Sequence, residues 1–313
     1  MSRDNSNNEF ALVPHPSQEL AAARITEIRV VAEMVEASLA LARESAISPA
    51  NLNALVRDAL KIYRPSKGMT PENVRAFGLF RQAAVGGNRE GQYWTGSIYG
   101  TGDGAKRDAA QSFAWLRLAA EQGVRSAQCL VGVSYFNGTG VTRDHVQALN
   151  WLRKAHEGGD SLATWCIGVC YRDGLAVAQD YAQAFIWFRK AAETGHAQAQ
   201  TSVGNCYGKE QGVARDWVAA VDWYRKAAEQ GEATGQFNLG LYYHHGMGVP
   251  GDLMEAYKWY RLAADQGDQR AERELKALER LMSRSELERA TALYRNCKYG
   301  KPTTDARHGL AAD

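Results

Sequence analysis

The sequence predicts an all-α solenoid of six 36-residue helix-turn-helix repeats with helical caps. The first observation is an eleven-residue phrase, NWLRKAHEGGD at 150–160, which returns at a fixed interval as IWFRKAAETGH, DWYRKAAEQGE and KWYRLAADQGD. The second is that three residue types keep this interval five times over. They are Trp115, Trp151, Trp187, Trp223 and Trp259; Gly123, Gly159, Gly195, Gly231 and Gly267; and Tyr99, Tyr135, Tyr171, Tyr207 and Tyr243. A catalytic motif is written once, whereas a phrase at constant spacing indicates tandem structural units.

Each repeat resolves into two helices joined by a glycine-containing turn. In 233–248, one helical face carries Gly235, Leu239, Gly240 and Tyr243. An aspartate then opens the second helix of each unit, and a Gln or Glu three residues later predicts a capping box in four of the five units. The aspartates are Asp108, Asp144, Asp180, Asp216 and Asp252. The second helix is expected to bury its Trp, and the glycine eight residues later is placed to end it in the left-handed conformation.

The repeats divide the chain into a central array and two ends. The units run 53–88, 89–124, 125–160, 161–196, 197–232 and 233–268, and the first is degenerate, with Leu79 in place of tryptophan. An atypical end unit is expected of a capping repeat. The remaining segments are an N-terminal amphipathic helix and cap (18–52), C-terminal capping helices (269–299), and polar tails expected to be disordered (1–17 and 300–313).

The residues beside the array predict three more helices. In 18–44, an apolar stripe holds Leu20, Ile25, Ile28, Val31, Val35 and Leu39, with Glu27, Glu33 and Glu36 opposite. That stripe is wide enough either to pack on the first repeat or to pair with a second chain. The next helix starts at Ser48 and Pro49, with a predicted buried face of Leu52, Leu55, Val56, Ala59 and Leu60. The last helix is predicted to start at Ser285, with Glu288 three residues on, and to reach about Cys297.

Composition is that of an ordinary soluble chain. Among 313 residues, 37 basic and 35 acidic side chains leave a formal net charge of +2, which creates no global field for nucleic acid or an anionic membrane. No apolar run approaches the roughly 20 residues of a membrane span, and the first residues lack a signal-peptide core. Five cysteines cannot all pair within one chain, so free thiols are expected. We therefore expect a cytoplasmic protein with no nucleic-acid partner and no membrane insertion.

The repeat pattern AxxxxxLGxxYxxGxGVxxDxxxAxxWYxKAAExG resembles the Sel-one-like repeat (SLR) family, which is related to tetratricopeptide repeats. Unit 233–268 matches this pattern nearly position by position. Unit 161–196 departs with Ala176 at the second turn-glycine position, and the following unit has Glu210 at the first. The resemblance implies a right-handed superhelix of antiparallel helix pairs and a role as an adaptor in protein complexes.

Several patterns that could carry chemistry have a structural explanation. Arginines at one repeat position could track phosphates, but a carboxylate follows four residues later in five of the six units, which predicts ion pairs on one helix face. This arginine ladder comprises Arg81, Arg117, Arg153, Arg189, Arg225 and Arg261. The loop Gly-Thr-Gly-Asp-Gly-Ala-Lys at 100–106 lacks the form of a phosphate loop. Neither the pair His244 and His245 nor the cysteines Cys166, Cys170 and Cys206 have metal-ligand spacing, so no metal and no cofactor is expected.

The predicted binding surface is the face of the first helices opposite the core. On this face the residue types change from unit to unit, whereas the residues at core positions repeat. This is expected if the core residues maintain the fold and the variable face binds a partner. In related solenoids that face lines the concave groove. The predicted partner-binding residues are Tyr93, Trp94, Leu130, Val133, Asn137, Trp165, Val169, Arg172, Asn205, Lys209, Phe237, Asn238 and His245. The three large aromatics, Trp94, Trp165 and Phe237, either anchor a partner or pack between adjacent units.

These observations favour a noncatalytic protein–protein interaction scaffold that holds a partner protein or peptide segment in the groove. The alternative is a homo-oligomeric scaffold assembled through residues 18–44. Every serine, histidine and carboxylate that we can place is repeated structure or isolated, so no catalytic residue is assigned. Some secreted relatives with cysteine pairs within each repeat have been linked with beta-lactam binding. Those pairs and an SxxK motif are missing here, which makes a beta-lactam- or cell-wall-related enzyme the least favoured reading.

Overall fold

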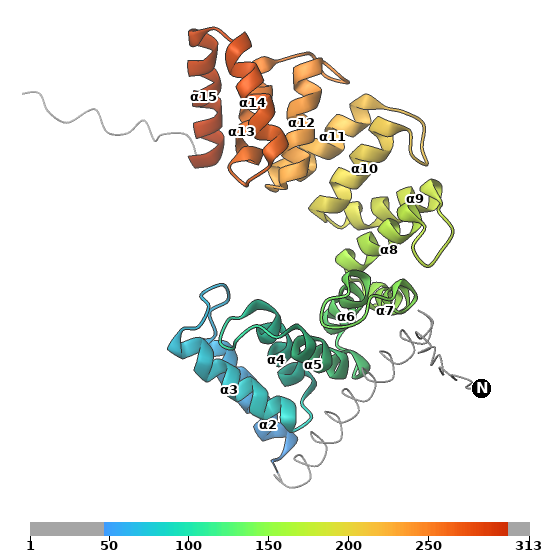
Figure 1. The fold of residues 1–313 in the computed structure, drawn as a ribbon, viewed down its shortest axis with the longest axis vertical. Coiled ribbons are helices and arrows are strands. Elements are labelled where there is room, and N and C mark those ends of the chain that lie inside the picture. Colours follow the sequence, from blue (N-terminus) through green and yellow to red (C-terminus); the bar gives the residue numbers. More distant parts are fainter. Residues whose placement is uncertain (1–46, 300–313) are drawn as a thin grey trace, which may run out of the picture. The chain divides into compact units, whose positions relative to one another are not determined.

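The structure is a computed structural model that describes residues 47–299, and this part of the chain contains fourteen α-helices and no strand (Figure 1). The predicted fold class, an all-α solenoid, is confirmed, because successive repeat helices pack on one another within each compact part of the chain. The predicted tails 1–17 and 300–313 and the predicted helix 18–44 lie outside the described residues. The chain forms two compact units, Met1–Gly158 and Gly159–Asp313, which are described separately.

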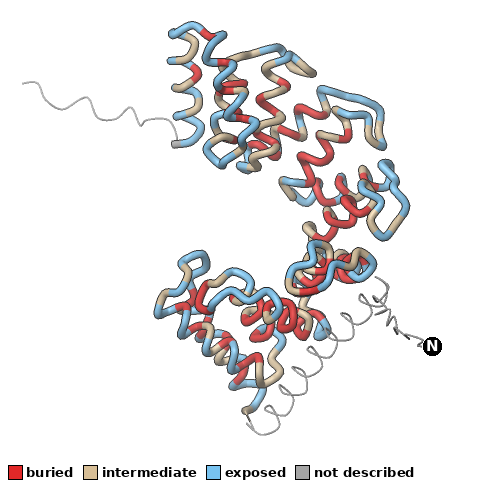
Figure 2. Tube along the Cα trace, in the orientation of Figure 1, coloured by how far each residue is buried: buried red, intermediate tan, exposed pale blue. Residues whose placement is uncertain are grey.

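The first compact unit contains three helix pairs. They are α2 (Pro49–Ile62) with α3 (Pro71–Val85), α4 (Arg89–Thr101) with α5 (Ala109–Glu121), and α6 (Arg125–Asn137) with α7 (His145–Glu157). Besides packing within their own pair, α3 and α5 pack on the first helix of the following pair. Figure 2 shows that buried residues lie along the sides of these helices and that exposed residues concentrate in the connecting loops. Stacking of neighbours therefore forms the core, as a repeat architecture requires.

The second compact unit contains three further pairs and two closing helices. The pairs are α8 (Ser161–Asp173) with α9 (Tyr181–Glu193), α10 (Ala197–Lys209) with α11 (Trp217–Glu229), and α12 (Ala233–His245) with α13 (Leu253–Ala264). The closing helices α14 (Gln269–Leu281) and α15 (Arg284–Tyr299) both pack on α13. The Tyr294 hydroxyl donates to the Asp265 carboxylate at 2.5 Å, and the Lys298 ammonium also contacts this carboxylate. These bonds attach α15 to the end of the last repeat.

An aspartate begins each second helix as predicted, but only half of the predicted capping box forms. The Asp108 carboxylate accepts the N–H of Gln111 at 2.9 Å, and the four equivalent aspartates cap their helices in the same way. The backbone N–H of Asp108 donates to the carbonyl of Tyr99 at 3.0 Å, where the capping box would have used a glutamine side chain. This bond recurs in all five units and ties the start of the second helix to the last turn of the first.

The last helix begins at Arg284, one residue before its predicted start at Ser285. Ser283 is the cap, and both its N–H and its hydroxyl lie 2.7 Å from Oε2 of Glu286. The N–H of Glu286 in turn donates to the Ser283 hydroxyl at 3.3 Å. A complete capping box therefore opens α15, and the predicted partner Glu288 instead pairs with Arg284 at 3.2 Å.

The repeat tryptophans are buried to different extents. Trp115, Trp151 and Trp259 are 5%, 6% and 6% exposed, whereas Trp187 and Trp223 are only half-buried, so the predicted burial holds for three of the five. A lysine three residues later lies over the ring in three units, as Lys154 does at 4.3 Å from the Trp151 centroid. In the last unit the preceding residue, Lys258, lies 4.4 Å from the Trp259 centroid instead. The glycines that follow all have φ between +81° and +94°, which confirms the predicted left-handed helix ends.

A hydrogen-bonded glutamine pair, which was not predicted from the sequence, joins successive repeats. The Gln122 side chain donates to Oε1 of Gln92 at 2.7 Å, and Gln92 donates to the carbonyl of Ala84 at 3.4 Å. Two units of the second half repeat the pair, through Gln230 with Gln200 and Gln266 with Gln236. Each carbonyl so bonded belongs to the last turn of the preceding second helix, where it also accepts the N–H of the glycine just past the helix.

Candidate functional site

In the first compact unit, the predicted binding face lies on α4 and α6. Its residues Tyr93, Trp94, Leu130 and Val133 are half-buried, and Asn137 is exposed. The Trp94 ring stacks on Phe80 with centroids 5.5 Å apart and meets the Tyr63 ring edge-on at 5.6 Å. Both partners belong to the preceding repeat, so Trp94 has a packing role between adjacent units.

In the second compact unit, the other two large aromatics also contact neighbouring elements. The indole N–H of Trp165 donates to the Ser202 hydroxyl on α10 at 2.9 Å, and its ring stacks on His196 at a centroid distance of 5.9 Å. The Phe237 ring lies 5.7 Å from that of Tyr260 on α13, and the Arg270 guanidinium of α14 lies 4.3 Å from the Phe237 centroid. Contacts with neighbouring elements therefore account for part of the burial of the Trp165 and Phe237 rings.

Two predicted residues, Asn205 on α10 and Asn238 on α12, form one hydrogen-bonded group. Oδ1 of Asn205 accepts from the Tyr224 hydroxyl at 2.9 Å and from the Asn238 amide at 3.3 Å. Both asparagines are half-buried, and the NH₂ group of Asn205 has no acceptor among the described residues. Lys209, one helical turn further along α10, is exposed. This part of the face therefore presents the fixed amide of Asn205, whose NH₂ group has no acceptor among the described residues, beside the accessible ammonium of Lys209.

The remaining predicted residues of the second unit differ in availability. Arg172 donates to both carboxylate oxygens of Asp173, at 2.7 and 2.8 Å, and this pairing lowers the pKa of Asp173. His245 is exposed and stacks on His244 with centroids 4.6 Å apart. Val169 is 7% exposed, so its side chain offers no surface to a partner, and we leave it out of the proposed contact set.

Most of the arginine ladder is charge-compensated on its own helix. Predicted pairs with the carboxylate four residues on form at Arg117, Arg189 and Arg261, with distances of 2.7, 2.8 and 3.5 Å. Arg225 instead contacts Asp222 at 3.3 Å and donates to the Tyr243 hydroxyl at 3.1 Å. In the described part of the chain, the predicted pair of Arg153 with Glu157 does not form, so four of the six ladder arginines carry paired charge.

The glycine-rich loop 100–106 holds a carboxylate of its own. Asp103 is 7% exposed, and its two oxygens accept the N–H groups of Ser66 at 2.9 Å and Gly68 at 2.8 Å. These bonds lower the pKa of Asp103. Because the loop presents an anion to the backbone donors around it, it anchors the first two repeats to each other and does not resemble a phosphate cradle.

Cys166, Cys170 and Cys206 of the second unit are buried and are not placed as metal ligands. Burial raises the pKa of the Cys166 thiol to about 12 and that of Cys206 to about 11, so both are protonated at neutral pH. Between residues 47 and 299, no group of three or more His, Cys, Asp or Glu side chains is arranged to hold a metal ion. In the same range, no helix combines the length and apolarity that a bilayer crossing requires.

We expect the second unit to lose stability through His196 as the pH falls below about 6.5. Nδ1 of His196 accepts the N–H of Ala199 at 3.2 Å and caps α10, so protonation of this nitrogen removes the cap. Burial lowers the pKa of His196 from its usual 6.5, and the nearby Asp160 carboxylate opposes this effect only in part. A lowered histidine pKa means that the unfolded chain takes up the proton first. Stability is therefore complete above the unfolded pKa and falls as the pH drops towards the folded one.

Thermal unfolding at about pH 7.5 and about pH 5.5 checks this expectation. In His196→Asn, an amide that caps helices well without titrating in this range replaces the imidazole. The midpoint of the variant should fall less between the two pH values than that of the wild type. Equal falls in both proteins would show that other groups cause the pH dependence.

The paired helices and their repeated contacts define a helical-repeat protein of the solenoid class. The Sel1 repeat model matches six segments of the chain: 53–88, 89–124, 125–160, 162–196, 197–232 and 233–268. The chain therefore belongs to the Sel1 repeat family, whose members are generally noncatalytic scaffolds for protein interactions.

Solved structures with the same repeat are similar to this chain. A Sel1 repeat protein from Oxalobacter formigenes is 29% identical, with a TM-score of 0.64, over 75% of this chain and 96% of that one. The protein c5321, described as a protective antigen present in uropathogenic Escherichia coli strains displaying an SLR fold, is 31% identical, with a TM-score of 0.51. That match covers 79% of this chain and 61% of c5321. No curated protein matches the sequence.

Proposed function

We propose that this protein is a noncatalytic scaffold that binds a segment of a partner protein on the first-helix face of α10 and α12. The observation that carries this proposal is the amide of Asn205. Two hydrogen bonds fix its oxygen, while its NH₂ group lacks an acceptor among residues 47–299. A fixed donor loses little conformational entropy on binding, and the carbonyls of an extended or helical-end segment supply the missing acceptor.

The exposed ammonium beside this amide favours an acidic segment. Lys209 is exposed one turn beyond Asn205, and His245 is exposed at the end of α12. A partner that places a backbone carbonyl on the amide and a carboxylate near Lys209 satisfies both groups. The proposed contact set is therefore Asn205, Lys209, Asn238 and His245.

The large aromatics are poor reporters of binding because they also hold the array together. Removing the Trp94 ring takes away its contacts with Phe80 and Tyr63, and removing that of Trp165 leaves Ser202 without its donor. A loss of binding in such variants would not separate lost recognition from lost packing. A clean test changes an exposed side chain that contacts no other element.

Lys209→Glu is expected to weaken capture of the partner at least tenfold, because a carboxylate would then face an acidic segment. Immobilised full-length wild type and variant would each be exposed to lysate of the source cell, and bound proteins would be quantified. The matched control is Lys276→Glu on α14, an exposed lysine outside the proposed face with the same charge change. A protein retained by the control and lost from Lys209→Glu supports the proposal. Equal retention by all three proteins, or equal loss in both variants, contradicts it.

A further inference from the structure

The outer face of α3 differs from the same face of every other second helix. Its four repeat positions carry Val74, Gly78, Arg81 and Val85. At the last of these positions the later units carry Glu121, Glu157, Glu193, Glu229 and Asp265. Arg81 is thus the one arginine of the ladder whose own helix lacks the carboxylate four residues on. Within residues 47–299, no carboxylate lies within ion-pair distance of it.

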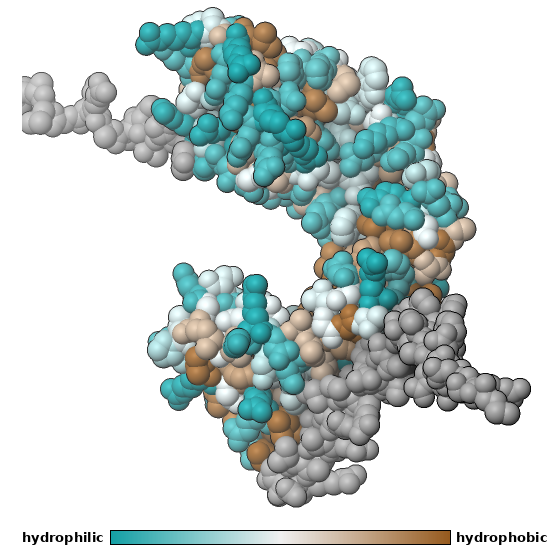
Figure 3. Space-filling model, viewed as in Figure 1, coloured by the Kyte–Doolittle hydropathy of each residue, from teal (hydrophilic) through white to brown (hydrophobic). Residues whose placement is uncertain are grey.

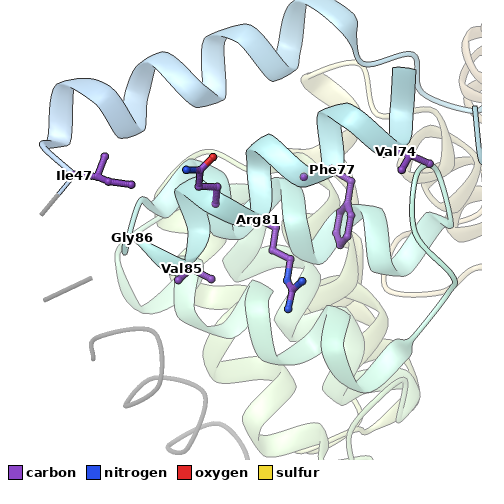
Figure 4. Close-up of a pocket in the computed structure, with 8 residues that line it drawn as sticks. Ile47, Val74, Phe77, Arg81, Val85 and Gly86 are labelled. Carbon is purple, nitrogen blue, oxygen red and sulfur yellow. The ribbon is translucent and has the colours of Figure 1, made fainter. Parts of the chain in front are cut away.

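This face forms a largely apolar groove of about 570 Å³. In Figure 4 the Phe77 and Arg81 side chains extend from the same side of α3, and Ile47 lies beyond the end that carries Val85. Figure 3 shows hydrophobic residues at the surface over α2 and α3. Val74 is 44% exposed, and so is Leu60 of α2, which the sequence analysis wrongly placed in the buried face.

We propose that residues 18–44 of the same chain dock in this groove. The described chain begins at Ile47, which lines the groove, so the segment 18–44 ends three residues from the site. A tether this short gives the segment an effective concentration of about millimolar or higher, which favours this occupant over a separate molecule. The proposal is independent of the proposed function, because the Asn205 face belongs to the other compact unit.

The chemistry of the segment complements that of the groove. Its apolar stripe, predicted from helical spacing, ends with Val31, Val35 and Leu39 near the tether. Glu36 was grouped above with the opposite face, but at about 100° per residue it lies beside Val35 and close to the angle of Ile25, so it borders this stripe. From there its carboxylate can reach Arg81 in the groove. Docking therefore supplies Arg81 with the partner that its own helix lacks.

The lengths also agree. Because the chain enters beside Val85, the end of the segment lies at that end of α3, and earlier residues extend towards Val74. Residues 31–44 would span roughly 20 Å as a helix, close to the roughly 22 Å of the fifteen residues of α3. The second half of the segment is thus sufficient to cover the groove.

Hydrogen exchange in the full-length protein tests this docking. Amides of 31–44 should be protected in the wild type and exchange at least tenfold faster in Val74→Glu, which places a carboxylate in the groove. The matched control is Val146→Glu, at the same repeat position of α7 and 57% exposed, which should leave 31–44 unchanged. Exchange in α4 and α5, which belong to the same compact unit as both substitutions, reports that each variant remains folded there.

A charge swap provides a second test that does not depend on the fold of Val74→Glu. Arg81→Glu should speed exchange in 31–44, and adding Glu36→Lys should restore protection. The proposal is overturned if 31–44 exchanges freely in the wild type, or as slowly in Val74→Glu and Arg81→Glu as in the wild type. Protection that disappears on dilution, together with a halved mass in light scattering, would instead assign the groove to a second copy of the chain.

Discussion

Gly140→Ala is expected to lower the free energy of unfolding of the first compact unit by about 3 kcal/mol, whereas Gly123→Ala should cost about 1 kcal/mol. Both glycines have positive φ, +73° and +81°. They differ in their surroundings, because a Cβ on Gly140 would lie 2.0 Å from the carbonyl oxygen of Ala109, while one on Gly123 would meet nothing within 4 Å. The backbone of α5 would have to move to admit the added methyl group.

The close approach, and not the left-handed conformation alone, is the source of the larger cost. Ala176 occupies the same repeat position with φ of +62°, so the conformation is compatible with a side chain. At Gly212 and Gly248, an added Cβ would again lie 2.0 and 2.3 Å from backbone atoms of the preceding second helix. The second turn glycine therefore sets the distance between successive repeats.

Hydrogen exchange of the α5 and α6 amides is the appropriate measurement, because repeats of a solenoid need not unfold together. Gly140→Ala should reduce protection at this junction much more than Gly123→Ala does, with α2 and α3 less affected. Similar losses in the two variants would show that backbone conformation dominates and that the approach to α5 is readily relieved.

The architecture could be predicted from the sequence because the residues that direct packing recur at the same positions in five repeats. Asp108 as a cap and Gly123 as a left-handed helix end follow from residue type and local position, which are properties of the chain alone. The bond from Asp108 to the Tyr99 carbonyl could not be predicted, because it depends on how closely the two helices of a pair approach. The Gln122–Gln92 bond likewise joins residues that meet only once the repeats are stacked.

The candidate site was predictable as a face but not in its details. Trp94 and Lys209 occupy positions that look equally available on a helical wheel. Whether the Trp94 ring is free depends on Tyr63 and Phe80, which the preceding repeat supplies. Buried Val169 shows the same limit, because helical periodicity places it on the predicted face but cannot reveal which neighbours cover it.

The two degrees of tryptophan burial lead to the second large prediction. Trp151→Ala is expected to cost about 3–5 kcal/mol, and Trp187→Ala about half as much. Trp151 is 6% exposed and packs in a cluster with Phe113, Tyr135 and Ala148, while the ammonium of Lys154 lies 4.3 Å from its ring. Trp187 occupies the same repeat position but is half-buried, and its lysine lies 5.5 Å from the ring.

The comparison tests whether burial or repeat position decides the contribution of the indole. Both variants remove the same side chain from the same place in the repeat, so helix propensity and capping are unchanged between them. Exchange protection of α6 and α7 in Trp151→Ala, set against that of α9 and α10 in Trp187→Ala, measures the two local losses. A larger loss of protection in Trp151→Ala supports burial as the source of the contribution, because the substitution leaves a cavity that is closed to solvent. Equal losses would mean that the contacts of the half-buried indole match those of the buried one, and that accessible surface is a poor guide to stability in this array.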